Sequence, residues 1–105
     1  MGPDLHLSEA QQDKVFAVMH AAEPQRRDHA KAVRKAHEAL HALNEAERFD
    51  EAKAAAAAKA LGDALAASAL QEARIHAQLQ AILTPEQRQL AAKSHAEHEP
   101  RQRPH

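Results

Sequence analysis

Two histidines and a glutamate lie within little more than one helical turn in the stretch HEALH, residues 37–41. This stretch fits the pattern H-E-x-x-H, in which the two histidines bind zinc and the glutamate acts as a general base. A zinc hydrolase also needs a third protein ligand, a substrate cleft and usually a second structural layer that holds the cleft. A chain of 105 residues leaves little room for these parts, so we predict no catalytic residue and no enzymatic activity.

The same pair, His37 and His41, is a candidate for metal binding without catalysis. Imidazole nitrogens one turn apart on a helix can hold Zn, Ni, Co or Cu, and another histidine or a partner chain could complete the shell. A second pair, His95 and His98, occurs near the C-terminus beside two glutamates. No other feature of the sequence requires a cofactor. The alternative is that these histidines are ordinary surface residues.

Nine histidines are many for a chain of this length. On a helical wheel at about 100° per residue, His29 falls on the apolar face, His37 lies near its edge and His41 lies toward the polar side. Protonation of all nine, at about pH 6.5, would move the formal net charge from −1 toward +8. Such a change could shift self-association or the binding of a partner, which makes proton sensing a third possibility.

The composition indicates a single all-α domain. Ala, Leu, Glu, Gln, Lys and Arg are abundant and only two glycines occur. With two Phe and neither Trp nor Tyr, much of the apolar surface is alanine, so a partner chain is expected to cover what the monomer cannot. The near-neutral net charge argues against a nucleic-acid partner. There is no Cys for a disulfide or thiolate site, and no apolar run approaches the length of a membrane span.

Helix start and stop signals divide the chain into four expected helices. Ser8, with Gln11 three residues later, opens the first with a capping box, and Pro24 is expected to end or sharply bend it. The second is expected over residues 25–43. A long third helix follows an N-cap at Asp50 and covers about residues 51–83. Thr84 caps the last, which is expected to run from 85 to about 96. We expect residues 1–6 to be a disordered or vector-derived terminus, 7–96 one helical domain and 97–105 a flexible tail.

The long third helix carries its larger apolar residues at irregular intervals. Leu65 and Leu70 contribute to its expected apolar face, while Ser68 and Glu72 interrupt one possible heptad seam. This irregularity favours bundle packing with close alanine contacts over a strict two-stranded coiled coil.

The two capping boxes share one pattern. LSEAQ at 7–11 and LTPEQ at 83–87 each contain a leucine, a capping hydroxyl and, three residues later, a glutamine. Together with RFDEAKAAAAAKA and ARIHAQLQAILTPEQRQL, these motifs resemble the Spy/CpxP family of periplasmic stress proteins, whose members carry paired L-T-x-x-Q motifs. The resemblance covers about residues 7–93. Its motif residues are Leu7, Ser8, Gln11, Leu83, Thr84 and Gln87.

The resemblance implies a helical-hairpin protomer that forms an antiparallel, cradle-like homodimer in the periplasm. It also implies an ATP-independent chaperone, a holdase, that binds unfolded or aggregation-prone clients on its concave face. Basic charge would attract clients, and modest apolar patches would hold them weakly. The residues that could do so are the basic Arg26, Arg27, Lys31, Arg34 and Lys35 and the apolar Val15, Val18 and Met19.

A periplasmic holdase is the leading hypothesis from the sequence. The alternative is a periplasmic metal-binding or metal-sensing protein, because the wider superfamily includes such sensors, and it would use His37 and His41. Suppression of aggregation without metal would favour the first hypothesis, and stoichiometric metal binding would favour the second.

Overall fold

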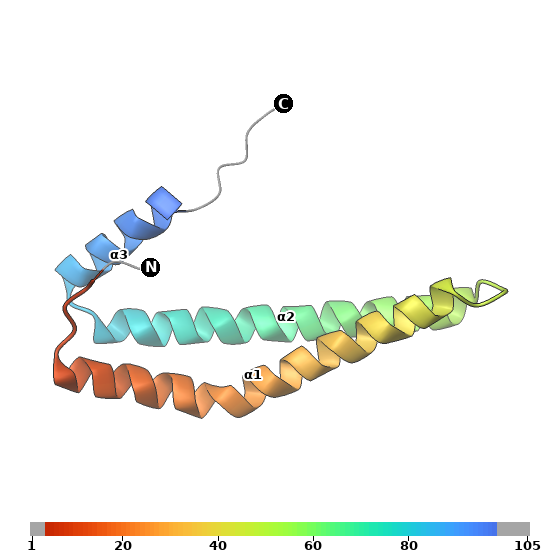
Figure 1. Ribbon diagram of the computed structural model, residues 1–105, viewed down its shortest axis with the longest axis horizontal. Coiled ribbons are helices and arrows are strands. Elements are labelled where there is room, and N and C mark those ends of the chain that lie inside the picture. The colour runs from red at the N-terminus through yellow and green to blue at the C-terminus, as the bar shows by residue number, and fades with distance from the viewer. Residues whose placement is uncertain (1–3, 99–105) are drawn as a thin grey trace.

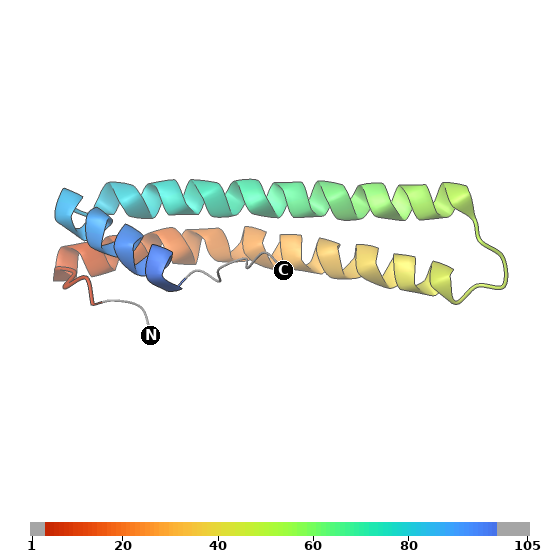
Figure 2. The same ribbon diagram turned by 90° about the horizontal axis from the view of Figure 1, so that it is seen from above.

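The computed structural model describes residues 4–98, which form three helices. α1 spans Glu9–Asn44, α2 spans Glu51–Ile82 and α3 spans Pro85–His98. α1 and α2 run side by side and antiparallel as a long hairpin, and α3 leaves its base at an angle (Figures 1 and 2). The described residues contain no strand. The all-α prediction is therefore confirmed, but with three helices instead of the expected four.

α1 continues through Pro24, so the expected boundary between the first two helices is wrong. A proline inside a helix removes one N–H donor and crowds the carbonyl four residues earlier, at a cost of about 3 kcal/mol. The helix accommodates it by bending, and Figure 1 shows α1 changing direction in its orange part. Half-buried residues occur on both sides of the bend, among them Val18 and Val33. Packing of both halves against α2 thus offsets the local cost of the proline.

One seam holds the hairpin together, with inward-facing residues spaced mainly three and four apart, as in a two-stranded coiled coil. Ser68 lies in this seam and Glu72 lies exposed beside it, so neither interrupts the packing as expected. The two long helices of this chain pair directly, without the bundle that the irregular leucines suggested. On α2 the seam runs through Ala54, Ala57, Leu61, Ala64, Ser68, Gln71 and Ile75, and on α1 through Val15, Val18, Ala22, Arg26, His29, Val33, Ala36, Leu40 and Leu43.

The interior of the hairpin is thin. Among the described residues, Ala36 and Ile75 are the buried apolar side chains and Gln71 is the buried polar one. Leu65 and Leu70, expected on the apolar face, are 49% and 51% exposed, because the helical repeat places them off the seam. The molecule measures 58 × 41 × 19 Å. None of the described helices has the length and hydropathy needed to cross a membrane.

Caps fix both ends of the hairpin. At the tip, residues 45–50 connect the helices, and the Asp50 carboxylate accepts a hydrogen bond from the backbone N–H of Lys53 at 3.0 Å. At the base, the Thr84 hydroxyl accepts a hydrogen bond from the backbone N–H of Gln87 at 3.1 Å and starts α3. α3 ends at His98, two residues beyond its expected end. Residues 1–3 and 99–105, which include most of the expected tail, lie outside the described residues.

Candidate metal site and hydrogen-bonded networks

His37 and His41 lie in the second half of α1, on its exposed surface near the tip of the hairpin. The helix places the two imidazoles one turn apart, the spacing from which both can bind one metal ion. His41 Nε2 lies 3.1 Å from Glu45 Oε1, with both side chains more than two-thirds exposed. Glu38 is also exposed, and its wheel position is nearly opposite the seam.

The described residues do not surround this pair with the parts of a hydrolase. Four pockets of the hairpin are lined by other residues, and none of these four includes His37, Glu38 or His41. The described helices form a two-helix hairpin with a short third helix at its base (Figures 1 and 2), and both histidines of the pair are exposed. The arrangement offers two imidazole ligands on an open surface.

Among the described side chains, no third ligand joins the pair, because no group of three or more His, Cys, Asp or Glu is gathered closely enough to hold a metal ion. Two other histidines have different neighbours: His6 lies 3.5 Å from Asp4 Oδ2, and the His20 ring stacks on Phe16 with centroids 5.6 Å apart. The side chains of the second pair, at positions 95 and 98, are outside the described ones.

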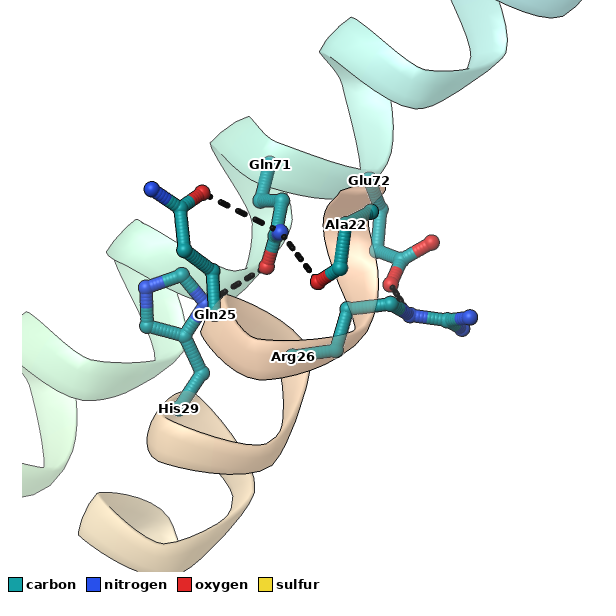
Figure 3. A network of polar contacts seen from close by, with 6 residues as sticks. All are labelled: Ala22, Gln25, Arg26, His29, Gln71 and Glu72. Atoms are coloured by element: carbon teal, nitrogen blue, oxygen red, sulfur yellow. Dashed lines mark hydrogen bonds and ion pairs between the residues drawn. The ribbon is translucent and has the colours of Figure 1, made fainter. Parts of the chain in front are cut away.

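His29 has the most specific environment of the described histidines (Figure 3). It is half-buried in the seam, and its Nδ1 lies 2.8 Å from the side-chain Oε1 of Gln71 on α2. Gln71 is 7% exposed, and its Nε2 donates to the carbonyl of Ala22 at 3.2 Å and to Gln25 Oε1 at 3.3 Å. Because Gln71 Oε1 can only accept, His29 carries a proton on Nδ1. The His29 ring therefore serves as a link between helices.

Two partners of Gln71, Ala22 and Gln25, lie within two residues of Pro24, so the network ties the bent part of α1 to α2. Every buried side-chain nitrogen and oxygen of the described residues has a partner, so Gln71 is buried without an unmatched polar atom. Sequence reasoning did not identify this residue. Its signal was its spacing, three residues after Ser68 and four before Ile75, which continues the seam.

The basic residues proposed for client binding on α1 differ in their environments. Arg26 is half-buried, and its Nε donates to Glu72 Oε1 on α2 at 2.8 Å. The other members are exposed, and the helical repeat places them together on the side of α1 opposite the seam: Arg27, Lys31, Arg34 and Lys35. The apolar residues proposed for client binding are half-buried between α1 and its neighbours: Val15, Val18 and Met19. The structure thus does not join the two sets into one continuous surface.

The two L-S/T-x-x-Q motifs meet at the base of the hairpin. Ser8 Oγ accepts from the backbone N–H of Gln11 at 3.1 Å, and Gln11 Oε1 accepts from the backbone N–H of Ser8 at 2.9 Å. Thr84 and Gln87 form the same reciprocal box, at 3.1 and 2.9 Å. Each box satisfies backbone N–H groups that a helix start otherwise leaves without partners.

The two glutamines also bind each other, and we call this pair of linked boxes the amide clasp. Gln11 Nε2 donates to Gln87 Oε1 at 2.8 Å, and Gln87 Nε2 donates to Gln11 Oε1 at 3.3 Å. The second hydrogen of each amide goes to a backbone carbonyl, that of Ile82 for Gln11 and that of Leu5 for Gln87, both at 3.0 Å. The motifs therefore connect the first helix, the end of the second and the start of the third.

Comparison with known protein families relates the chain to a described family. A family model described as heavy-metal resistance matches residues 2–90, which is most of the chain. No curated protein and no solved structure gives a significant match. The matched range includes both capping motifs and the exposed pair His37 and His41. On this match, the chain belongs to the heavy-metal resistance family.

Proposed function

We propose that this protein binds a transition-metal ion through His37 and His41 and contributes to metal resistance. The observation that carries the proposal is the exposed histidine pair, one turn apart on α1, in a chain of the heavy-metal resistance family. The metal-binding hypothesis, which the sequence ranked second, is therefore preferred to the holdase hypothesis. We assign the chain to the periplasm by its resemblance to the Spy/CpxP proteins.

The donor atoms define the class of metal. Neutral imidazole nitrogens suit Zn, Ni, Co and Cu, whereas Mg and Ca prefer sets of oxygen ligands. The chain has no Cys, so it offers none of the thiolates that select the softest ions. Glu45 already approaches His41 at 3.1 Å, which positions a carboxylate next to the site. Zn would then bind where the imidazoles are deprotonated, and its binding would weaken as they become charged.

Two histidines fill only half of a tetrahedral zinc shell. Since the described side chains supply no third clustered ligand, we propose that water or a second copy of the chain supplies the remainder. A homodimer is also favoured by the thin interior, in which Ala36 and Ile75 are the buried apolar residues described.

Calorimetric titration of the metal-free protein with Zn, Ni, Co and Cu tests this proposal. We expect at least one ion to bind with a defined stoichiometry, and the double variant His37→Ala/His41→Ala to lose that binding. A matched control is His20→Ala/His76→Ala, which removes two exposed histidines that are not paired. If the control weakens binding as much as the test variant, or if neither does, the site at His37 and His41 is wrong.

A holdase is the second candidate, and exposed apolar side chains favour it. Phe16, Leu65 and Leu70 are 69%, 49% and 51% exposed, and such residues can hold unfolded clients weakly. Aggregation of a chemically denatured test protein should then be suppressed at a near-stoichiometric ratio, without nucleotide or metal. No suppression at several-fold excess, in a sample whose circular dichroism shows folded helix, would exclude this function.

A further inference from the structure

An apolar pocket of about 510 Å³ lies at the base of the hairpin, where the N-terminal segment, α2 and α3 meet. Its volume falls within the range of about 300–1,000 Å³ that is typical of pockets for small organic ligands. Val15 of α1 and three pairs of apolar residues form its walls: Leu5 and Leu7 before α1, Leu79 and Leu83 around the end of α2, and Ala91 and Ala92 on α3. None of these residues is buried by the rest of the chain.

The amide clasp holds these walls in place. The Leu5 carbonyl accepts from Gln87 Nε2 at 3.0 Å, which fastens the N-terminal segment to the start of α3. His6 adopts a left-handed conformation, with φ of 53°, and its N–H donates to Asp4 Oδ1 at 2.9 Å. These contacts fix the turn that brings Leu5 and Leu7 to the pocket. The pocket is thus preformed, and a ligand would not have to order its walls.

The charge of the pocket is of one sign. Its titratable lining residues are Arg88 on α3 and His76 on α2, and no carboxylate lines it. The ion pairs of the described side chains involve other cations, and Arg88 has no hydrogen-bonded or ionic partner among those side chains. An apolar pocket with an unpaired guanidinium at its rim is complementary to a molecule that has an apolar body and one anionic group.

We propose that this pocket binds a single-chain anionic amphiphile, with its alkyl chain among the leucines and its carboxylate or phosphate group on Arg88. A chain of roughly ten carbons fits within a pocket of this volume. Neither an extended peptide nor a second protein chain is as well matched, because the lining offers few polar groups for a peptide backbone: His76, Gln80 and Arg88. This site is separate from the metal pair, which lies near the other end of the hairpin.

Calorimetry with decanoate, decyl phosphate and the neutral decyl maltoside, each below its micelle concentration, tests the proposal on the full chain. We expect saturable binding of one anionic amphiphile per chain and much weaker binding of the neutral one. Arg88→Gln should weaken the binding about tenfold, since a charge-assisted contact is lost. Arg74→Gln, a matched exposed arginine on α2 outside this pocket, should leave the affinity unchanged. Comparison of the affinities for decanoate and decyl phosphate shows whether the natural ligand has a carboxylate or a phosphate head group.

A pocket-filling variant provides the second arm. Ala92 is exposed, so Ala92→Phe should fill the pocket without removing a packed side chain, and it should abolish binding. If that variant loses helix content by circular dichroism, Ala91→Leu replaces it. Non-saturable binding, equal affinity for the neutral amphiphile, or equal effects of Arg88→Gln and Arg74→Gln would overturn the proposal. A second copy of the chain would be the occupant of the pocket if the unmodified protein is a dimer that binds no amphiphile and Ala92→Phe dissociates that dimer. This result would also overturn the proposal.

Discussion

The side-chain amides of Gln11 and Gln87 donate to and accept from each other, at 2.8 and 3.3 Å, although 76 residues separate them in the sequence. Each amide also closes its own capping box and binds one backbone carbonyl. Both hydrogens and the carbonyl oxygen of each side chain are therefore used. The repeated motif is consistent with this geometry, because the glutamine of each box supplies both the donor and the acceptor that the reciprocal bonds need.

Removal of either glutamine of the amide clasp should destabilise the fold. Gln11→Ala or Gln87→Ala leaves backbone N–H and C=O groups without their partners. Each single variant should therefore lower the free energy of unfolding by about 1–3 kcal/mol. The double variant should cost less than the two single variants together, with a coupling of at least about 0.5 kcal/mol. Urea denaturation followed by circular dichroism measures all three.

Gln89→Ala is the control for that cycle. Gln89 is exposed on α3, and its truncation should change the unfolding free energy by no more than about 0.5 kcal/mol. Strictly additive single variants would show that the two amides do not interact in solution.

The hydroxyl of Thr84 should contribute to stability on its own. Thr84→Ala removes the side-chain acceptor for the N–H of Gln87 and should lower the unfolding free energy by about 1 kcal/mol. Thr84→Ser keeps the oxygen, as Ser8 does at the equivalent position, and should cost much less. A denaturation midpoint that is the same for Thr84→Ala and the unmodified chain would mean that Thr84 does not cap α3.

Truncation of two neighbouring residues on α2 should lower the stability of the fold by very different amounts. Gln71 is 7% exposed and bonded to three partners on α1, so Gln71→Ala should cost about 2 kcal/mol or more. Glu72 forms a partly exposed pair with Arg26, and Glu72→Ala should cost less than about 1 kcal/mol. Equal shifts in the thermal midpoint for the two variants would contradict the buried network.

Gly62 offers a stabilising substitution. Apart from the neighbouring residues and backbone of its own helix, an added Cβ would meet no atom within 4 Å, and the residue lies inside α2. Gly62→Ala should therefore raise the unfolding free energy by about 1 kcal/mol, since glycine is the poorer helix former. The reverse change at a nearby exposed position, Ala60→Gly, should lower it by a similar amount. A loss of stability in Gly62→Ala would indicate that a partner chain packs closely against this position.

Local signals in the sequence predicted the helix starts well, because a cap depends on residues three positions apart. Ser8, Asp50 and Thr84 each begin a helix. Pro24 led to a wrong helix boundary because the outcome there does not depend on local residues alone. Its effect on the backbone is local, but whether the helix continues depends on packing against α2, which lies far away in sequence. The bend satisfies both requirements.

The seam and the networks were harder to predict. Gln71 is polar, so it did not count toward an apolar face, yet α1 supplies Gln25, His29 and a carbonyl to satisfy it. Leu65 did count and is exposed. The polarity of each residue alone therefore predicted the wrong side of α2 for both Gln71 and Leu65. The three-and-four spacing of the seam residues on α2 would have placed both correctly. The spacing of His37 and His41 was visible in the sequence, but the absence of a third ligand among the described side chains required the structure.

The thin interior determines how the protein responds to denaturants. Its accessible surface is 8663 Å², against about 5,800 Å² for a compact folded monomer of this mass. The slope of unfolding free energy against urea concentration scales with the area that unfolding exposes, so this chain should have a shallow slope. A change of a single kilocalorie, from a lost cap or from a bound ligand, then moves the urea midpoint by an unusually large amount. A hairpin of this kind is sensitive to whatever covers its surface.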